Sequence, residues 1–122
     1  MMEGKKDEEK LYHAMLKGMI KQLKEKNIEV IQADLEGYKQ PEIIEKNKPD
    51  ILGMNKDGKP IIIKVVTETT INSDETREIF KEFSKVDGEF WVEVPESSSK
   101  EIAEKIKEWK TPVNKWFVGR DI

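Results

Sequence analysis

Asp50 and Lys64 stand on either side of a segment that has the composition of a tight turn. That segment, Asn-Lys-Asp-Gly at residues 55–58, matches a type I turn closed by a glycine in the left-handed region, which gives a hairpin with a three-residue loop. If residues 56–58 form the loop, the pairing continues outward until Asp50 lies directly across from Lys64. The sequence therefore predicts a carboxylate and an ammonium group facing each other on two adjacent strands.

The predicted pair lies among apolar side chains. Alternate residues of a strand point to the same side of a sheet, so both charges should share a face with Leu52, Ile62 and Val66. A buried charge without a partner is costly, and we therefore expect the two charged groups to be bonded to each other.

Carboxylates are the side chains on which any metal chemistry of this chain would depend. The sequence contains no cysteine and only one histidine, His13, which excludes disulfides, thiolate chemistry and multi-histidine metal sites. A metal ion would have to be a hard ion such as Mg²⁺ or Mn²⁺, with Asp50 as the first candidate ligand. His13 lies near the start of the first predicted helix and is interpreted either as a general base or as a structural histidine.

Hydrophobic periodicity predicts the elements that position these residues. Apolar residues at helical spacing predict a helix over residues 8–26 and a second that begins at Ser73, and a capping box of Ser98 with Glu101 predicts a third. Apolar and β-branched runs predict strands at residues 28–33, 49–54, 60–67, 89–95 and 115–118. The 60–67 run is apolar on both faces, which is typical of a central strand covered on both sides.

The order of these elements predicts an α/β fold with a mixed central β-sheet flanked by helices in three layers. A chain of 122 residues favours one domain, which we place at residues 8–122. Residues 1–7 are polar, and we expect them to be a frayed, disordered N-terminus. No apolar run has the length needed to cross a bilayer, and the N-terminus has no signal-peptide pattern, so we expect a cytoplasmic protein without a membrane partner.

The centre of the chain resembles the PD-(D/E)xK nuclease superfamily. The resemblance consists of Pro49-Asp50, a hairpin, a hydrophobic strand bearing a charged residue and then a helix. Gly37, Tyr38 and Pro41 match a Gly-Tyr…Pro segment found upstream of the Pro-Asp in small members. The similarity covers about residues 8–110 at the level of element order, and it implies a restriction-endonuclease-like αβββαβ core.

The resemblance also implies a metal site, of which this chain keeps only part. In active members the Asp and a following Glu hold a divalent ion, which activates water for phosphodiester hydrolysis, and a Lys lies two residues beyond the Glu. Asp50 matches the Asp. In one alignment Lys64 replaces the Glu and Val66 replaces the Lys; in the other Lys64 is the Lys and Ile62 replaces the Glu. The hairpin register favours the first alignment, and both lack one acid.

We therefore expect a degenerate site in which an Asp50–Lys64 salt bridge replaces the metal centre. If the chain is active instead, Asp50 is a metal ligand for Mg²⁺ or Mn²⁺, Lys64 is the catalytic lysine, and a migrated carboxylate completes the site. Glu68, two residues beyond Val66, is the first candidate for that acid. The other candidates are Glu8, Glu9 and Glu36.

Charge and surface residues leave three functions open. The net charge of −3 does not favour a strong nucleic-acid binder, but Lys17, Lys21 and Lys24 on the first helix form either a local basic strip or a solvated face. One hypothesis is a non-catalytic module that binds nucleic acid weakly or a protein partner. A second is a divalent-metal-dependent nuclease. A third is a structural or self-associating domain, in which Trp116 and Phe117 contribute to a homodimer interface.

Overall fold

The computed structural model describes residues 2–44 and 46–119, with the side chains of the helical residues before Glu8 left out. The chain forms one five-stranded sheet in the order β1-β2-β3-β4-β5. The strands are β1 (Glu29–Ala33), β2 (Ile51–Met54), β3 (Pro60–Val65), β4 (Glu89–Pro95) and β5 (Lys115–Gly119). The helices are α1 (Met2–Glu25), α2 (Asp74–Phe83) and α3 (Ser99–Trp109), the last preceded by the 3₁₀ turn η1 (Glu96–Ser98).

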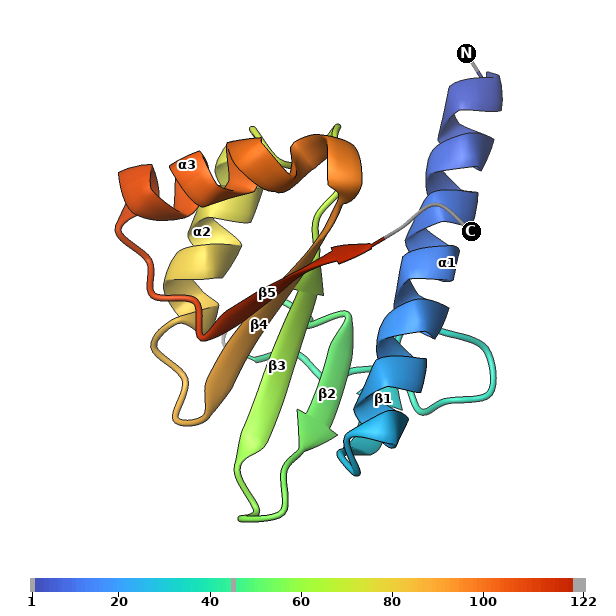
Figure 1. Cartoon of the computed structure of the whole chain (residues 1–122), viewed down its shortest axis with the longest axis vertical. Coiled ribbons are helices and arrows are strands. Elements are labelled where there is room, and N and C mark those ends of the chain that lie inside the picture. The colour runs from blue at the N-terminus through green and yellow to red at the C-terminus, as the bar shows by residue number, and fades with distance from the viewer. Residues whose placement is uncertain (1, 45, 120–122) are drawn as a thin grey trace.

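The sheet is mixed and its two faces are covered by different helices. Strands β1, β2 and β3 pair antiparallel, whereas β3, β4 and β5 pair parallel. Helix α1 lies on one side of the sheet, and α2 and α3 lie on the other (Figure 1). The predicted three-layer α/β fold with a mixed central sheet is confirmed, and the elements follow one another in the order αβββαβ before α3 and β5.

Each face of the sheet has its own hydrophobic core. Leu16, Met19 and Leu23 of α1 pack with the side chains of Ile63 and Trp91. On the other face, aromatic and aliphatic side chains of α2, β4 and α3 form the second cluster, with Phe80, Phe83, Phe90, Val92 and Ile102 all buried. Strand β3 sends Ile61 and Ile63 into the first cluster and Ile62 into the second, which confirms the predicted central strand.

The β2–β3 hairpin has the register that the turn residues predict. Ile51 pairs with Ile63 and Met54 with Pro60. The Gly58 N–H donates to the Asn55 carbonyl oxygen at 3.0 Å, and Gly58 has a φ of +80°, which a residue with a Cβ rarely adopts. The Asn55 side chain accepts from the Lys59 N–H at 2.9 Å, so the asparagine that opens the turn also bonds its closing residue.

The ends of the helices agree only partly with the predictions. Ser73 caps α2 as predicted, since its hydroxyl accepts from the Thr76 N–H at 3.1 Å. Helix α1 begins at Met2 rather than Glu8, because residues 2–7 are mostly Met, Glu and Lys, which favour helix. The predicted Ser98 capping box is wrong: η1 has already turned the chain there, and Ser98 makes no side-chain cap.

Helix length and polarity bear on the membrane prediction. Within the described residues, no helix combines the length and the apolar character needed to cross a membrane.

Candidate functional site

The Asp50 side chain extends the hydrogen-bond ladder between β2 and β3. Its backbone N–H donates to the Ile63 carbonyl oxygen at 3.0 Å. Its carboxylate Oδ2 accepts from the Val65 N–H at 2.6 Å, and Oδ2 also lies 3.6 Å from Lys64 Nζ. The predicted Asp50–Lys64 salt bridge is therefore present. The carboxylate takes the place of a strand carbonyl, which is a structural use of this aspartate.

The second oxygen of Asp50 bonds to helix α1. Oδ1 accepts a short hydrogen bond from the Tyr12 hydroxyl. Because α1 covers the face opposite α2 and α3, Asp50 does not stand among Leu52, Ile62 and Val66, which belong to the other core. That part of the prediction is wrong, since Asp50 precedes β2 and its side chain bonds the Val65 N–H of β3 and the Tyr12 hydroxyl of α1.

Tyr12 joins two carboxylates. Its hydroxyl also lies 2.9 Å from Asp34 Oδ2, beyond the end of β1. Burial raises the pKa of Tyr12 far above its ordinary value, and the negative charge of Asp50 raises it further. The hydroxyl therefore keeps its proton and remains a donor, and a single proton can serve only one of the two carboxylates at a time.

Glu68 does not approach Asp50 as a migrated acid. Strand β3 ends at Val65, and the Thr67 carbonyl oxygen accepts from the Ile71 N–H at 3.0 Å, which turns the chain out of the strand. Glu68 is exposed on that turn, where it accepts from the Ser97 hydroxyl. The predicted strand of residues 60–67 is therefore too long, because the threonine-rich segment closes a turn instead of extending the strand toward Glu68.

Glu8 is a candidate acid that borders the same pocket as Lys64 of the salt bridge. It lines a pocket of about 280 Å³ with Glu9, Tyr12 and Lys64. Its carboxylate accepts from the Thr67 hydroxyl at 2.6 Å and from the Thr69 hydroxyl, and these bonds lower its pKa. Glu36 lies elsewhere, exposed in the loop after β1.

Glu93 is a buried acid near Asp50 that the sequence analysis missed. It lies in β4 opposite Val65 of β3 and is 2% exposed. Burial raises its pKa to about 8, with a further contribution from the charge of Asp50. Its Oε1 is fully buried and has no hydrogen-bond partner among the described residues. The signal was present in the sequence. Glu93 lies two residues after Trp91, so both side chains point to the same face of the strand, and Trp91 is an inward-facing residue.

These carboxyl groups do not fit a Mg²⁺ or Mn²⁺ site. The Asp50 carboxylate is already bonded to the Val65 N–H, the Tyr12 hydroxyl and the Lys64 ammonium, and the raised pKa of Glu93 keeps that acid largely neutral at pH 7. Val66, the position aligned with the catalytic lysine, is fully buried in the apolar core. Within the described part of the chain, no three His, Asp or Glu side chains are arranged to hold a metal ion.

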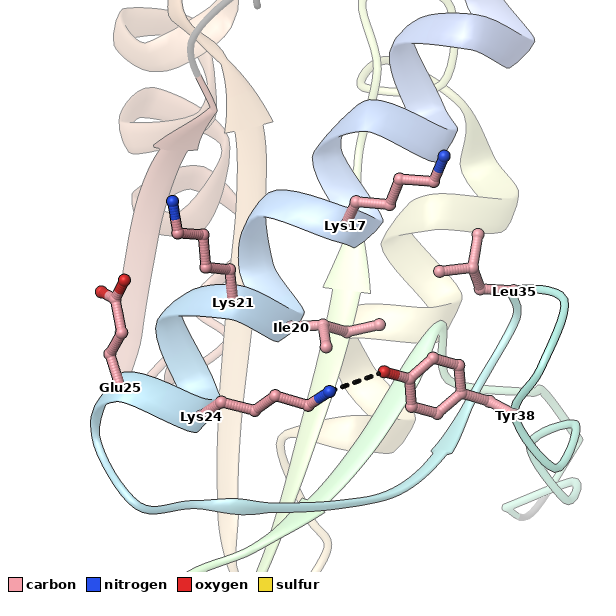
Figure 2. Close-up of a pocket in the computed structure, with 7 residues that line it drawn as sticks. All are labelled: Lys17, Ile20, Lys21, Lys24, Glu25, Leu35 and Tyr38. Atoms are coloured by element: carbon pink, nitrogen blue, oxygen red, sulfur yellow. Dashed lines mark hydrogen bonds between the residues drawn. The ribbon is translucent and has the colours of Figure 1, made fainter.

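The predicted lysine strip borders a second pocket on α1. Lys17, Lys21 and Lys24 line a pocket of about 500 Å³ together with Leu35 and Tyr38 of the loop after β1. Lys24 Nζ donates to the Tyr38 hydroxyl at 3.1 Å and lies 5.6 Å from the centre of its ring. Figure 2 shows Lys24 reaching toward Tyr38, whereas Lys21 points to the other side of the helix. The structure thus places an aromatic ring beside the lysines, which the sequence analysis did not predict.

The remaining candidates lie on the surface. His13 is exposed, and its ring packs at a tilt against Tyr12, with 5.7 Å between ring centroids. Trp116 is 42% exposed on β5, while Phe117 is half-buried against Trp91.

A comparison of the chain with protein-family models, curated proteins and solved structures finds no match.

Proposed function

We propose that this protein is a non-catalytic module with a restriction-endonuclease-like core, which binds a nucleic-acid strand weakly through helix α1. The αβββαβ order of elements and the Pro49-Asp50 segment ahead of the β2–β3 hairpin support the likeness to that core. The functional part of the proposal depends on two sites, the salt bridge at Asp50 and the lysines beside Tyr38.

The contacts of Asp50 are the observation that carries the non-catalytic part. A metal ligand must offer a free lone pair and a negative charge to the ion. Here a backbone N–H, a tyrosine hydroxyl and an ammonium group already compete for both oxygens of the carboxylate. The Lys64 ammonium also supplies the positive charge that a divalent ion would bring, so binding of the ion would require its displacement.

The lysine pocket supports the binding part. Lys17 and Lys24 are exposed on α1, and Tyr38 of the loop after β1 directs its half-buried ring toward Lys24 (Figure 2). Ammonium groups attract the phosphates of a strand, and an aromatic ring offers a surface on which a base can stack, whatever its sequence. The net charge of −3 opposes long-range attraction, so the affinity should be modest and strongly dependent on salt.

The binding surface can be tested with a fluorescent single-stranded oligonucleotide followed by anisotropy. If Lys17 and Lys24 each neutralise one phosphate, the plot of log affinity against log salt should have a slope of about −1 to −2. Lys17→Gln with Lys24→Gln should weaken binding roughly tenfold at low salt and flatten this slope. Tyr38→Leu should weaken binding without changing the slope, because stacking releases no counterions.

A matched control is Lys100→Gln with Lys107→Gln, which removes two exposed lysines from α3 on the other face of the sheet. This variant should bind as the unaltered protein does. Equal losses in both double variants would show that net charge alone drives binding, and the proposed surface would be wrong.

A further inference from the structure

Helix α1 also borders a pocket on its flank toward β5. This pocket has a volume of about 390 Å³ and is lined by Ala14, Met15, Gly18 and Gln22 of α1, Glu93 of β4, and Val118 and Gly119 of β5. None of these residues lines the lysine pocket beside Tyr38. The two pockets therefore lie on different flanks of the same helix and differ in chemistry.

The wall of the β5 pocket contains the most deeply buried carboxyl group near the site. Glu93 is 2% exposed, and its Oε1 lacks a hydrogen-bond partner among the described residues. Its Oε2 lies 3.2 Å from the place that a Cβ on Gly119 would take, so this oxygen borders the pocket. Oε2 is therefore the oxygen that a donor in the pocket can reach, and a hydrogen bond to it would offset part of the cost of burying the carboxyl group.

The charges around Glu93 favour a cation. Asp50 adds negative charge nearby, and Lys64 is engaged with Asp50. Each salt bridge within residues 8–44 and 46–119 pairs other residues, so no described lysine or arginine neutralises Glu93. A cation in the pocket would supply the missing opposite charge.

The shape of the pocket favours a slender alkyl ammonium. Ala14 and Gly18 leave room beside the acid because their side chains are minimal, and no atom lies within 4 Å of a Cβ built on Gly18, whereas the Met15 side chain packs against Gly119. Val118 offers an apolar wall for methylene groups, and the Gln22 side chain offers a carbonyl oxygen as a second acceptor. A guanidinium prefers both oxygens of a carboxylate, but Oε1 of Glu93 is sealed from the pocket.

We propose that the pocket between α1 and β5 binds a primary ammonium group carried on an unbranched alkyl chain, with the Glu93 carboxylate as its counter-ion. A free alkylamine and a lysine side chain of a peptide present the same chemistry, and the test below separates them.

Binding should be linked to a proton. Glu93 has a pKa of about 8, so at pH 7 the acid must lose its proton to pair with an ammonium. The titratable groups near it are Asp50, which precedes β2, and its two partners, Lys64 of β3 and Tyr12 of α1. Lys115 of β5 lies over the Trp91 ring instead. The affinity should therefore rise up to tenfold per pH unit between pH 6 and 8.

Calorimetry with n-butylammonium provides the test, with n-butanol as an uncharged control. A ligand of this size should bind the full chain with a Kd of roughly 1 mM at pH 8. The alcohol should not bind, and Glu93→Gln should abolish binding. Gly18→Leu should also weaken binding at least tenfold by filling the pocket without touching Glu93. A tripeptide with a central lysine and blocked ends separates the two sources of the ammonium group. Tighter binding than that of butylammonium identifies a peptide lysine as the ligand, and equal or weaker binding identifies a free amine.

Three results would overturn the proposal. They are no heat with butylammonium, equal binding by Glu93→Gln, and an affinity that does not change with pH. Arg120 follows Gly119 in the sequence and lies outside the described residues, so the titration is repeated with Arg120→Ala. Binding that appears only in Arg120→Ala would also contradict the proposal, because the pocket would then be filled from within the chain.

Discussion

Replacing Asp50 with alanine is expected to lower the free energy of unfolding by about 3 to 5 kcal/mol, as for a buried charge whose partner is removed. The change leaves the Val65 N–H and the Tyr12 hydroxyl without their acceptor and the Lys64 ammonium without its counter-charge. Urea unfolding followed by circular dichroism measures the loss. A large loss is expected because Asp50 is 8% exposed, so water replaces these bonds poorly.

Two milder variants test individual contacts of Asp50. Asp50→Asn keeps an oxygen for the Val65 N–H and should lose less than Asp50→Ala. Tyr12→Phe removes one hydrogen bond and should cost about 1 kcal/mol, because it leaves the carboxylate with its other two donors. If Asp50→Ala leaves the stability unchanged or raises it, the aspartate is not held by the fold, and its structural role is contradicted.

Glu93 is expected to make the protein less stable as the pH rises from about 4.5 to about 8. Its pKa is raised in the folded state, so its protonated form stabilises the fold fully below the unfolded value of 4.5, and this stabilisation is lost as the pH rises through the folded value. The loss should amount to about 3 to 5 kcal/mol over this range. Unfolding in urea at several pH values measures it.

Glu93→Gln is the matched variant for this pH dependence. It keeps the shape of the side chain but cannot ionise, so its stability should stay level where that of the unaltered protein falls. Glu8 has a lowered pKa, so its effect has the opposite sign and occurs only as the pH falls below the ordinary range of a glutamate. If the stabilities of the two proteins changed with pH in parallel, folding would not raise the pKa of Glu93, and the prediction would be contradicted.

The hairpin could be predicted in detail because its signals are local. The Asn55–Gly58 turn sets the loop length, and the loop length fixes which residues of β2 and β3 face each other. The Asp50–Lys64 pair followed from that register alone. In the same way, the two-sided apolar pattern of residues 60–65 was sufficient to place β3 at the centre of the sheet.

The parts that failed depend on contacts between distant segments. The Tyr12 hydroxyl bonds to Asp50 across 38 residues, and the α1 segment alone does not indicate which side of the sheet it will cover. The strand of residues 60–67 was predicted to continue through Thr67 because Thr is β-branched, although the Thr70 hydroxyl bonds the Thr67 backbone and closes a turn there. Glu93 was overlooked because an acid in a strand is ordinarily on the solvent side.

Titration of the unaltered protein with Mn²⁺ in a calorimeter tests most directly whether Asp50 is engaged by the protein instead of a metal. We predict no heat of binding at millimolar Mn²⁺, because both oxygens of the carboxylate are held by the Val65 N–H, the Tyr12 hydroxyl and Lys64. Saturable binding of one Mn²⁺ per chain that disappears in Asp50→Asn would contradict this account.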